Sequence, residues 1–161
     1  MQIRTLTEAD YAQVVLLYME LDDIHARARP DCFVHRSKEE TYPKDAYLSN
    51  LSSPDVLQLG AFDGEKLAGV LRATLWEESI MVKNLKTVCL DDIYVLPEYR
   101  RRGIAAKLFH ETERWARQRG AVRLDLHTWD FNQGAIALYR AMGMTVQRYV
   151  FEKKLDTGIG E

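Results

Sequence analysis

The chain has little cysteine and proline, with two and four among 161 residues, and no excess of charge of one sign. Cys32 and Cys89 lie far apart, have apolar or acidic neighbours and match no metal-ligand spacing, so we expect reduced structural thiols, no disulfide and no metal. The 22 basic and 24 acidic residues give a net charge of −2, which creates no broad positive field. This balance argues against a nucleic-acid-binding protein.

Long apolar runs are also missing, since none approaches the roughly 18 residues that a membrane-spanning helix needs. The segment MQIRTLTEADYAQV lacks the charged, then apolar, then small-residue order of a signal peptide. We therefore expect a cytoplasmic protein that does not bind membranes. Neither G-x-x-x-x-G-K-S/T nor G-x-G-x-x-G occurs, which argues against nucleotide hydrolysis and dinucleotide binding.

The composition, 47% hydrophobic and 29% charged, predicts one globular domain over residues 1–161. Thr7 and Asp10 resemble a capping box that opens a helix over 8–21. Asp63 and Gly64 predict a tight turn between two antiparallel strands. Strands are predicted over 2–6, 56–62, 66–75, 88–96 and 122–128, with one or two more over 144–155. The pattern indicates an α+β protein with a mixed sheet and helices on both faces.

The segment LDDIYVLPEYRRRGIAAKLF, from Leu90 to Phe109, carries the most information. A strand-like run ends at Pro97, and apolar residues at spacings of three and four predict a helix that begins near 102–104 and ends before Gly120. The start of that helix exposes unpaired N–H groups, and Gly103 lets a ligand approach the backbone. The arginines at 100–102 add guanidinium groups that match phosphate oxygens. An ordinary solvated basic turn would explain the same residues.

The pattern Arg100-x-x-Gly103-x-Ala105 resembles the acyl-CoA pyrophosphate loop of the GNAT N-acetyltransferase superfamily, Q/R-x-x-G-x-G/A. The strand AVRLDLHTW, then Asn132 and the helix AIALYRAMG follow in the family's order. The resemblance extends over essentially the whole chain and is strongest over 88–155. It implies a GNAT-like, mostly antiparallel sheet whose fourth and fifth strands splay apart, with acetyl-CoA in the gap.

The same resemblance assigns roles to residues. Asn132 corresponds to an asparagine that contacts the cofactor, and Tyr139 to a tyrosine near the acetyl sulfur, which would act as the general acid. Tyr139 could equally be a buried aromatic on its helix face. The backbone of the fourth strand would pair with the pantetheine arm. The implied cofactor-binding residues are Ile93, Tyr94, Val95, Arg100, Arg101, Arg102, Gly103, Ile104, Ala105, Asn132 and Tyr139.

Transfer of an acetyl group to an amine of pKa near 10 needs a group that removes a proton. Asp91 and Asp92 are the best placed, and the resemblance to polyamine and aminoglycoside acetyltransferases favours Asp91 as the catalytic residue. Strand alternation puts the two side chains on opposite faces, and a bulge could exchange them. Glu77, Glu78 and His127 are further candidates for the base.

The family's acceptor site lies between its first helices and the loop before the fourth strand. In this chain that region is rich in acidic residues, which would suit a cationic amine, although a solvated helix end explains them as well. The stretch HARARPDCF resembles one in bacterial GNAT proteins of unassigned substrate. The candidate acceptor residues are Tyr18, Asp22, His25, Asp31, Phe33 and Glu77.

These features together predict an acetyl-CoA-dependent N-acetyltransferase that moves the acetyl group directly from the thioester to a primary amine, leaving coenzyme A. The acceptor would be a small molecule (a polyamine, an aminoglycoside or an amino-acid-like amine) or a peptide. The alternatives are a longer acyl-CoA donor and a non-catalytic acyl-CoA-binding or regulatory module of the same fold. A homodimer is possible, since the run at 149–151 would suit strand pairing across a two-fold axis, or equally a core strand.

Overall fold

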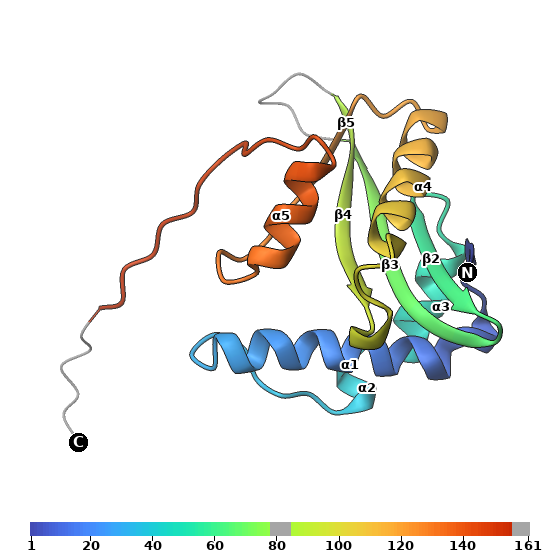
Figure 1. The fold of residues 1–161 in the computed structure, drawn as a ribbon, viewed down its shortest axis with the longest axis horizontal. Coiled ribbons are helices and arrows are strands. Elements are labelled where there is room, and N and C mark those ends of the chain that lie inside the picture. Colours follow the sequence, from blue (N-terminus) through green and yellow to red (C-terminus); the bar gives the residue numbers. More distant parts are fainter. Residues whose placement is uncertain (78–84, 156–161) are drawn as a thin grey trace.

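A five-stranded sheet in the order β1-β2-β3-β4-β5 forms the centre of the computed structural model, which describes residues 1–77 and 85–155 (Figure 1). Neighbouring strands from β1 to β4 are antiparallel, whereas β5 is parallel to β4. The strands are β1 (Gln2–Thr5), β2 (Val56–Asp63), β3 (Lys66–Glu77), β4 (Lys86–Val95) and β5 (Arg123–Leu126). This mixed, mostly antiparallel sheet confirms the expected fold class.

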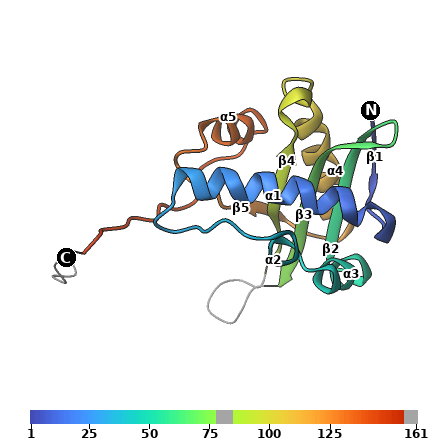
Figure 2. The same ribbon diagram turned by 90° about the horizontal axis from the view of Figure 1, so that it is seen from below.

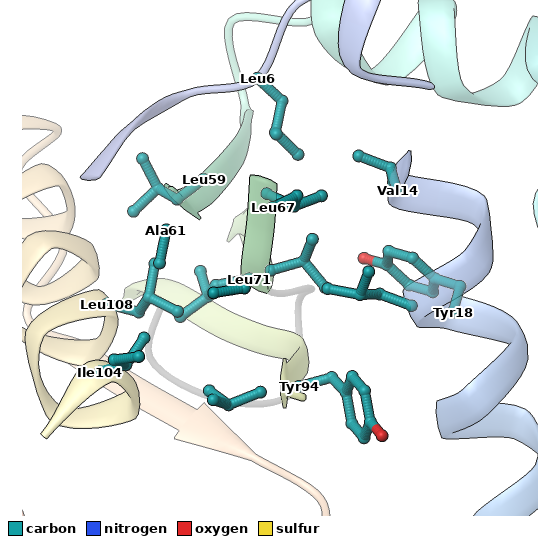
Figure 3. Close-up of a cluster of buried hydrophobic side chains, with 14 of the residues drawn as sticks. Leu6, Val14, Tyr18, Leu59, Ala61, Leu67, Leu71, Tyr94, Ile104 and Leu108 are labelled. Carbon is teal, nitrogen blue, oxygen red and sulfur yellow. The ribbon is translucent and has the colours of Figure 1, made fainter. Parts of the chain in front are cut away.

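Helices cover both faces of the sheet. α1 (Tyr11–Ala28) packs against β3 and β4, and α4 (Ile104–Gln118) packs against β2, β3 and β4. Figure 3 shows the side chains of Val14 and Tyr18 on one side of the sheet and those of Ile104 and Leu108 on the other. Figure 2 shows α1 crossing the strands. The remaining helices are η1 (Glu8–Asp10), α2 (Lys38–Thr41), α3 (Lys44–Ser52), η2 (Pro97–Tyr99) and α5 (Gln133–Ala141).

Local sequence explains the central hairpin and α4. Gly64 lies in the left-handed region at φ +60°, so the predicted turn between β2 and β3 is confirmed. β2 is buried on both faces, because helices cover both, and its sequence is therefore almost continuously apolar. α4 begins within the predicted window and ends just before Gly120, which has φ +73°.

The first long helix differs from its predicted end at Leu21, because α1 continues for two more turns to Ala28. Charged residues such as Asp22 and Asp23 therefore lie on a helix rather than beyond its end. The helix stops at Arg29, which has φ −136° and ψ 65°. Arg29 precedes Pro30, and a proline disfavours helical backbone in the residue before it.

The prediction of one or two strands over 144–155 is wrong, because the structure has no strand there. Residues 145–155 instead form an extended segment, here called the C-terminal arm, which runs away from the sheet past the end of α1 (Figure 1). Ion pairs of Arg29 with Glu152 at 2.9 Å and of Asp31 with Lys154 at 3.0 Å attach it there. Strand-forming residues need a neighbouring edge to pair with, and the arm meets none among residues 1–77 and 85–155.

An ion pair fastens β1 to the start of the helical segment. The Arg4 guanidinium donates to both carboxylate oxygens of Asp10 at 2.8 Å. The same carboxylate accepts from the backbone N–H and the hydroxyl of Thr7, each at 2.8 Å, which confirms the predicted capping box. The hydrogen bonds from Arg4, with those from Thr7, lower the pKa of Asp10 to about 2.

We predict that Asp10→Asn lowers the free energy of unfolding at neutral pH by about 1 to 2 kcal/mol, the range for losing a helix cap or a charged hydrogen bond. A lowered carboxyl pKa contributes stability that is complete above the ordinary pKa and is lost as the pH falls toward about 2. Urea unfolding at neutral pH and near pH 2 measures both values. Asp45→Asn, an exposed acid in the first turn of α3, is the control. A difference from the wild-type protein that is equal at both pH values would contradict this account.

Candidate active site

A β-bulge in β4 shapes the site. Arg72 of β3 is in register with Asp92 and Ala73 with Leu90, so Asp91 is an extra residue. Both carboxylates reach the same guanidinium: Nη2 of Arg72 lies 2.8 Å from Oδ2 of Asp92, and Nε lies 3.6 Å from Oδ2 of Asp91. The Thr74 hydroxyl donates to Asp91 at 2.6 Å. The simple alternation that put Asp91 and Asp92 on opposite faces is therefore wrong, because the bulge turns both toward Arg72.

Asp92 lies in a buried, negatively charged environment. Burial raises the pKa of its carboxyl, and the charges of Asp91 and Asp22 add to this effect while Arg72 opposes it. One carboxylate oxygen of Asp22, Oδ2, is buried without a hydrogen-bond partner in the part of the chain that the structure describes. A carboxylate with a raised pKa is a stronger proton acceptor, and an unpaired buried oxygen favours binding of a cation.

Two tyrosines lie close to Asp92. Tyr139 of α5 is only 9% exposed, and burial together with the charge of Asp92 raises its pKa to about 12. Tyr18 of α1 is also buried, and burial followed by the charge of Asp92 raises its pKa well above the usual value. Its ring packs against that of Tyr42 with centroids 4.9 Å apart. The structure thus brings together both carboxylates and the tyrosine that sequence analysis predicted as catalytic.

The strands β4 and β5 separate next to these residues. β5 pairs with β4 only along Thr87–Leu90, although β4 continues to Val95. Within the described residues, Asp91–Val95 therefore has no neighbouring strand on the β5 side, which confirms the predicted splaying. Ile93, Tyr94 and Val95 lie in this open part of β4, where the N–H and C=O groups of alternate residues point away from β3. A ligand that carries amide groups could pair with them as a strand would.

The loop between β4 and α4 is shaped to receive an anion. Gly103 lies in the left-handed region at φ +74°, and so does the non-glycine residue Arg101 at φ 62°, an uncommon conformation. Among the described residues no side chain caps α4, and apart from Gly103 and its two chain neighbours none has an atom within 4 Å of where a Cβ on Gly103 would stand. The first N–H groups of α4, near Ile104 and Ala105, are therefore open to an anionic ligand.

The arginines of this loop differ in their contacts. Nε of Arg100 donates to the Val95 carbonyl at 3.0 Å, and Nη2 donates to the Tyr94 hydroxyl at 3.4 Å. These two hydrogen bonds hold the side chain of Arg100 against the end of β4. Arg102 lies over the ring of Tyr99, 5.2 Å from its centroid. Among the described residues, Arg101 forms no hydrogen bond or ion pair, so its guanidinium is the one most available to a ligand.

A cavity of about 310 Å³ lies between α1 and the end of β4. Tyr94 and Arg100 on its wall are sequence-predicted cofactor residues, and the Tyr94 hydroxyl donates to Glu20 at 2.8 Å. Sequence analysis missed the α1 side of this cavity, partly because it ended the helix too early. The lining residues are Glu20, Asp23, Ile24, Arg27, Tyr94, Pro97 and Arg100.

The predicted acceptor residues separate into groups. Tyr18 and Asp22 lie at the carboxylate pair. His25 and Phe33 form an aromatic cluster with Trp129 and Phe131, in which neighbouring ring centroids lie 5.3 to 6.3 Å apart.

The other predicted residues of the acceptor site lie elsewhere. Asp31 is bound to Arg29 and Lys154, and the hydrogen bond from Arg29 is the main reason that its pKa is lowered. Glu77 ends β3, and Glu78 is outside the described residues. His127 contacts Arg148 of the C-terminal arm.

Asn132, predicted from the family resemblance to contact the cofactor, is the N-cap of α5. Its Oδ1 accepts a hydrogen bond from the backbone N–H of Ala135 at 3.2 Å. The side chain therefore sets where α5 begins, and with it the position of Tyr139 about two turns later. The side-chain NH₂ group forms no hydrogen bond to any residue that the structure describes.

Sequence analysis missed Arg72, which binds both carboxylates of the candidate site. It is the one charged residue within the apolar part of β3, LAGVLRATLW, and a lone arginine in a buried strand indicates a buried partner.

The cysteines contribute no ligand set: Cys89 is half-buried, and within the described ranges no three His, Cys, Asp or Glu residues are grouped to hold a metal ion. In those same ranges no helix is long and apolar enough to cross a membrane.

Known proteins resemble this chain in sequence. A family model described as Acetyltransferase (GNAT) family matches residues 18–144. Aminoglycoside N(6')-acetyltransferase type 1 of Acinetobacter genomosp. 13 is 33% identical over 107 residues, which are 65% of this chain and 73% of that protein. Thialysine N-epsilon-acetyltransferase of Bos taurus is 40% identical over 58 residues, 36% of this chain, and the match spans only about a third (34%) of that relative's length.

Solved structures agree with the sequence match. A crystal structure of a mutant BH1408 protein from Bacillus halodurans has a TM-score of 0.89 and 26% identity, covering 96% of this chain and 99% of that one. Aminoglycoside N-acetyltransferase AAC(6')-Iy in complex with CoA has a TM-score of 0.70 at 20% identity, covering 96% and 100%, and at that identity it shows the shared fold alone. Because the family model matches well over half of the sequence, this chain belongs to the GNAT family of acetyltransferases.

Proposed function

We propose that the protein is an acetyl-CoA-dependent N-acetyltransferase, built as one domain and acting in the cytoplasm on a primary amine. The observation that carries this proposal is the pair of carboxylates that Arg72 holds beside the part of β4 that has no neighbouring strand among the described residues. A proton acceptor thus lies next to an open backbone edge, and the charge of Asp92 reaches the Tyr139 hydroxyl and raises its pKa. Membership of the GNAT family supports acetyl transfer, and the named activities of the aminoglycoside and thialysine relatives support amines as acceptors.

Acetyl-CoA fits the open groups of the site. The uncapped start of α4 with Gly103 suits its diphosphate, and the edge at Ile93–Val95 suits the amides of its pantetheine arm. When bound, acetyl-CoA supplies an acetyl group activated as a thioester. The proposed cofactor-binding residues are Ile93, Tyr94, Val95, Arg100, Arg101, Arg102, Gly103, Ile104, Ala105, Asn132 and Tyr139.

Side chains of the protein accept the proton of the amine and donate a hydrogen bond to the leaving sulfur. An acceptor ammonium is attracted by Asp22 and Asp92, and the carboxylate pair of Asp91 and Asp92 accepts its proton to free the amine. With a pKa of about 12 the Tyr139 hydroxyl stays protonated at neutral pH. Complete proton transfer to a thiolate of ordinary pKa near 8.5 would be uphill by roughly 5 kcal/mol, so Tyr139 acts mainly by hydrogen-bond donation to the sulfur.

The acceptor is proposed to be a small-molecule amine (polyamine, aminoglycoside or amino-acid-like) or a peptide amine. Tyr18 and Asp22 would contact its ammonium group, while His25 and Phe33 would contact its more distant part. Asp31 and Glu77 stay predictions. Release of free thiol from acetyl-CoA should be measured across polyamines, aminoglycosides, amino acids and peptides. Acetyl-CoA binding with no turnover across this panel would favour the non-catalytic module.

Gly103→Asp should weaken acetyl-CoA binding at least tenfold, because it adds a side chain and a negative charge where the phosphate oxygens would lie. Isothermal titration calorimetry measures the affinity. Gly120→Asp is a closely matched control, since Gly120 has nearly the same backbone conformation at the other end of α4. Absence of binding by the wild-type protein would overturn the cofactor proposal, and equal affinities for all three proteins would overturn the assignment of the loop.

Tyr139→Phe should lower kcat by about 10- to 100-fold, because the hydroxyl supports the leaving sulfur during the reaction. Acetyl-CoA affinity should change little, since the ring and its packing are retained. Steady-state kinetics and calorimetry separate the two effects. Tyr149→Phe removes a hydroxyl from an exposed tyrosine of the C-terminal arm and should leave kcat unchanged. Full turnover by Tyr139→Phe would refute the assignment.

The raised pKa of Asp92 predicts that kcat/KM falls on the acid side as this carboxyl becomes protonated, at a pH above the ordinary carboxyl range. Asp92→Asn should lower kcat/KM and remove that limb of the pH profile. Asp91→Asn is the paired variant, because it makes the same change one residue away on the same arginine. Loss of the limb in Asp91→Asn alone would make Asp91 the base. An unaltered profile in both variants would refute a carboxylate base.

A further inference from the structure

The cavity between α1 and the end of β4 has charged side chains on its α1 wall, and they differ in whether they have partners. Glu20 accepts a hydrogen bond from the Tyr94 hydroxyl at 2.8 Å. Asp23 contacts Nδ1 of His35 at 2.7 Å. Arg27 is exposed and forms no hydrogen bond or ion pair with any residue that the structure describes. Within the described residues, Arg27 is therefore the charge of this wall that stays available to a ligand.

Helix spacing separates this wall from the carboxylate pair. Glu20, Ile24 and Arg27 follow the i, i+4 and i+7 spacing of one helix face. Glu20 is two residues away from both Tyr18 and Asp22, and residues two apart do not share a helix face. α1 thus presents one face to the carboxylate pair, where an acceptor amine would bind, and another face to the cavity.

The other wall of the cavity leads to the open start of α4. Tyr94, Pro97 and Arg100 form this wall, and Gly103 follows three residues after Arg100. Nε and Nη2 of Arg100 donate hydrogen bonds, whereas its Nη1 forms none within the described ranges. Two guanidinium groups with unused donors, one on each wall, favour an anionic ligand, and their planar geometry matches phosphate oxygens.

We propose that Arg27 of α1 binds a phosphate group of acetyl-CoA across this cavity, opposite Arg100. The inference rests on the proposed use of acetyl-CoA and adds a contact from α1 to those of the loop over 100–105. Arg27 then contributes to donor specificity, because a thioester without phosphate groups gains nothing from its charge. The phosphate gives Arg27 the hydrogen-bond acceptor that it lacks among the described residues.

Isothermal titration calorimetry with acetyl-CoA tests the proposal. Arg27→Gln should weaken binding about tenfold, the effect of losing a hydrogen bond to a charged group. Arg27→Lys keeps the positive charge and should lose less affinity. Arg117→Gln is the matched control, because it removes an exposed arginine from the far end of α4, and it should bind like the wild-type protein. Circular dichroism confirms that each variant is folded.

Salt dependence distinguishes a charge contact from a structural role of Arg27. Because Arg27 is exposed, added salt should weaken acetyl-CoA binding more steeply in the wild-type protein than in Arg27→Gln. Dephosphorylated acetyl-CoA, which lacks the 3'-phosphate, locates the contact. An equal loss of affinity with both ligands assigns Arg27 to the diphosphate, and a loss with acetyl-CoA alone assigns it to the 3'-phosphate.

Two results would overturn the role of Arg27 and leave the proposed cofactor in place. One is wild-type affinity in Arg27→Gln, and the other is weaker binding with the same salt dependence as the wild-type protein. A wild-type protein that does not bind acetyl-CoA would overturn the proposed function as well.

Discussion

The ion pair of Arg72 with Asp91 and Asp92 is the constraint on which the candidate site depends. One guanidinium holds two carboxylates that would otherwise repel one another in a partly buried place. The pairing is possible only because the bulge at Asp91 turns both side chains to the same side of β4. Directly after the bulge, β4 has no neighbouring strand on the β5 side in the described residues. The paired carboxylates and the open backbone edge therefore both arise at the bulge in β4.

The candidate site keeps polar groups that can bind a ligand, whereas the core of the sheet consists of closely packed apolar side chains. In the sheet core, residues such as Leu71 and Leu108 are completely or almost completely buried, and they provide the apolar burial that stabilises the fold. Around the gap, by contrast, Arg101 adopts an uncommon backbone conformation, and within the described part of the chain Asp22 keeps an unpaired oxygen and α4 has no side-chain cap. Raised pKa values, backbone strain and open amides together are typical of a site that receives a ligand.

Sequence analysis predicted the features that local chemistry determines. The turn at Gly64, the helix start at Ile104 and the end of α4 near Gly120 follow from residue type and spacing. Alternation cannot predict a bulge, because one inserted residue reverses every face after it, and so the shared contact of Asp91 and Asp92 was left open. Arg72 was missed although its charge within an apolar strand was a visible signal. The proposal of a catalytic role for Tyr139 came from family resemblance and not from its spacing.

The C-terminal arm shows why strand prediction fails without a partner. Its sequence has the composition of a strand, but pairing is a property of two edges and not of one segment. The helix end at Ala28 was missed for a different reason, since the charges of Asp22 and Asp23 suggested a loop although both residues lie, partly buried, within α1. Because the helix was predicted to end at Leu21, sequence analysis also missed Arg27 and the other residues of α1 that line the cavity.

The central claim is that acetyl-CoA occupies the gap beside β4 with its phosphates at the start of α4. Hydrogen–deuterium exchange of the wild-type protein, with and without saturating acetyl-CoA, tests it directly. The account predicts that exchange slows most in residues 91–95 and 100–105. Binding that leaves both segments unchanged, or protects a different face of the sheet, would contradict it.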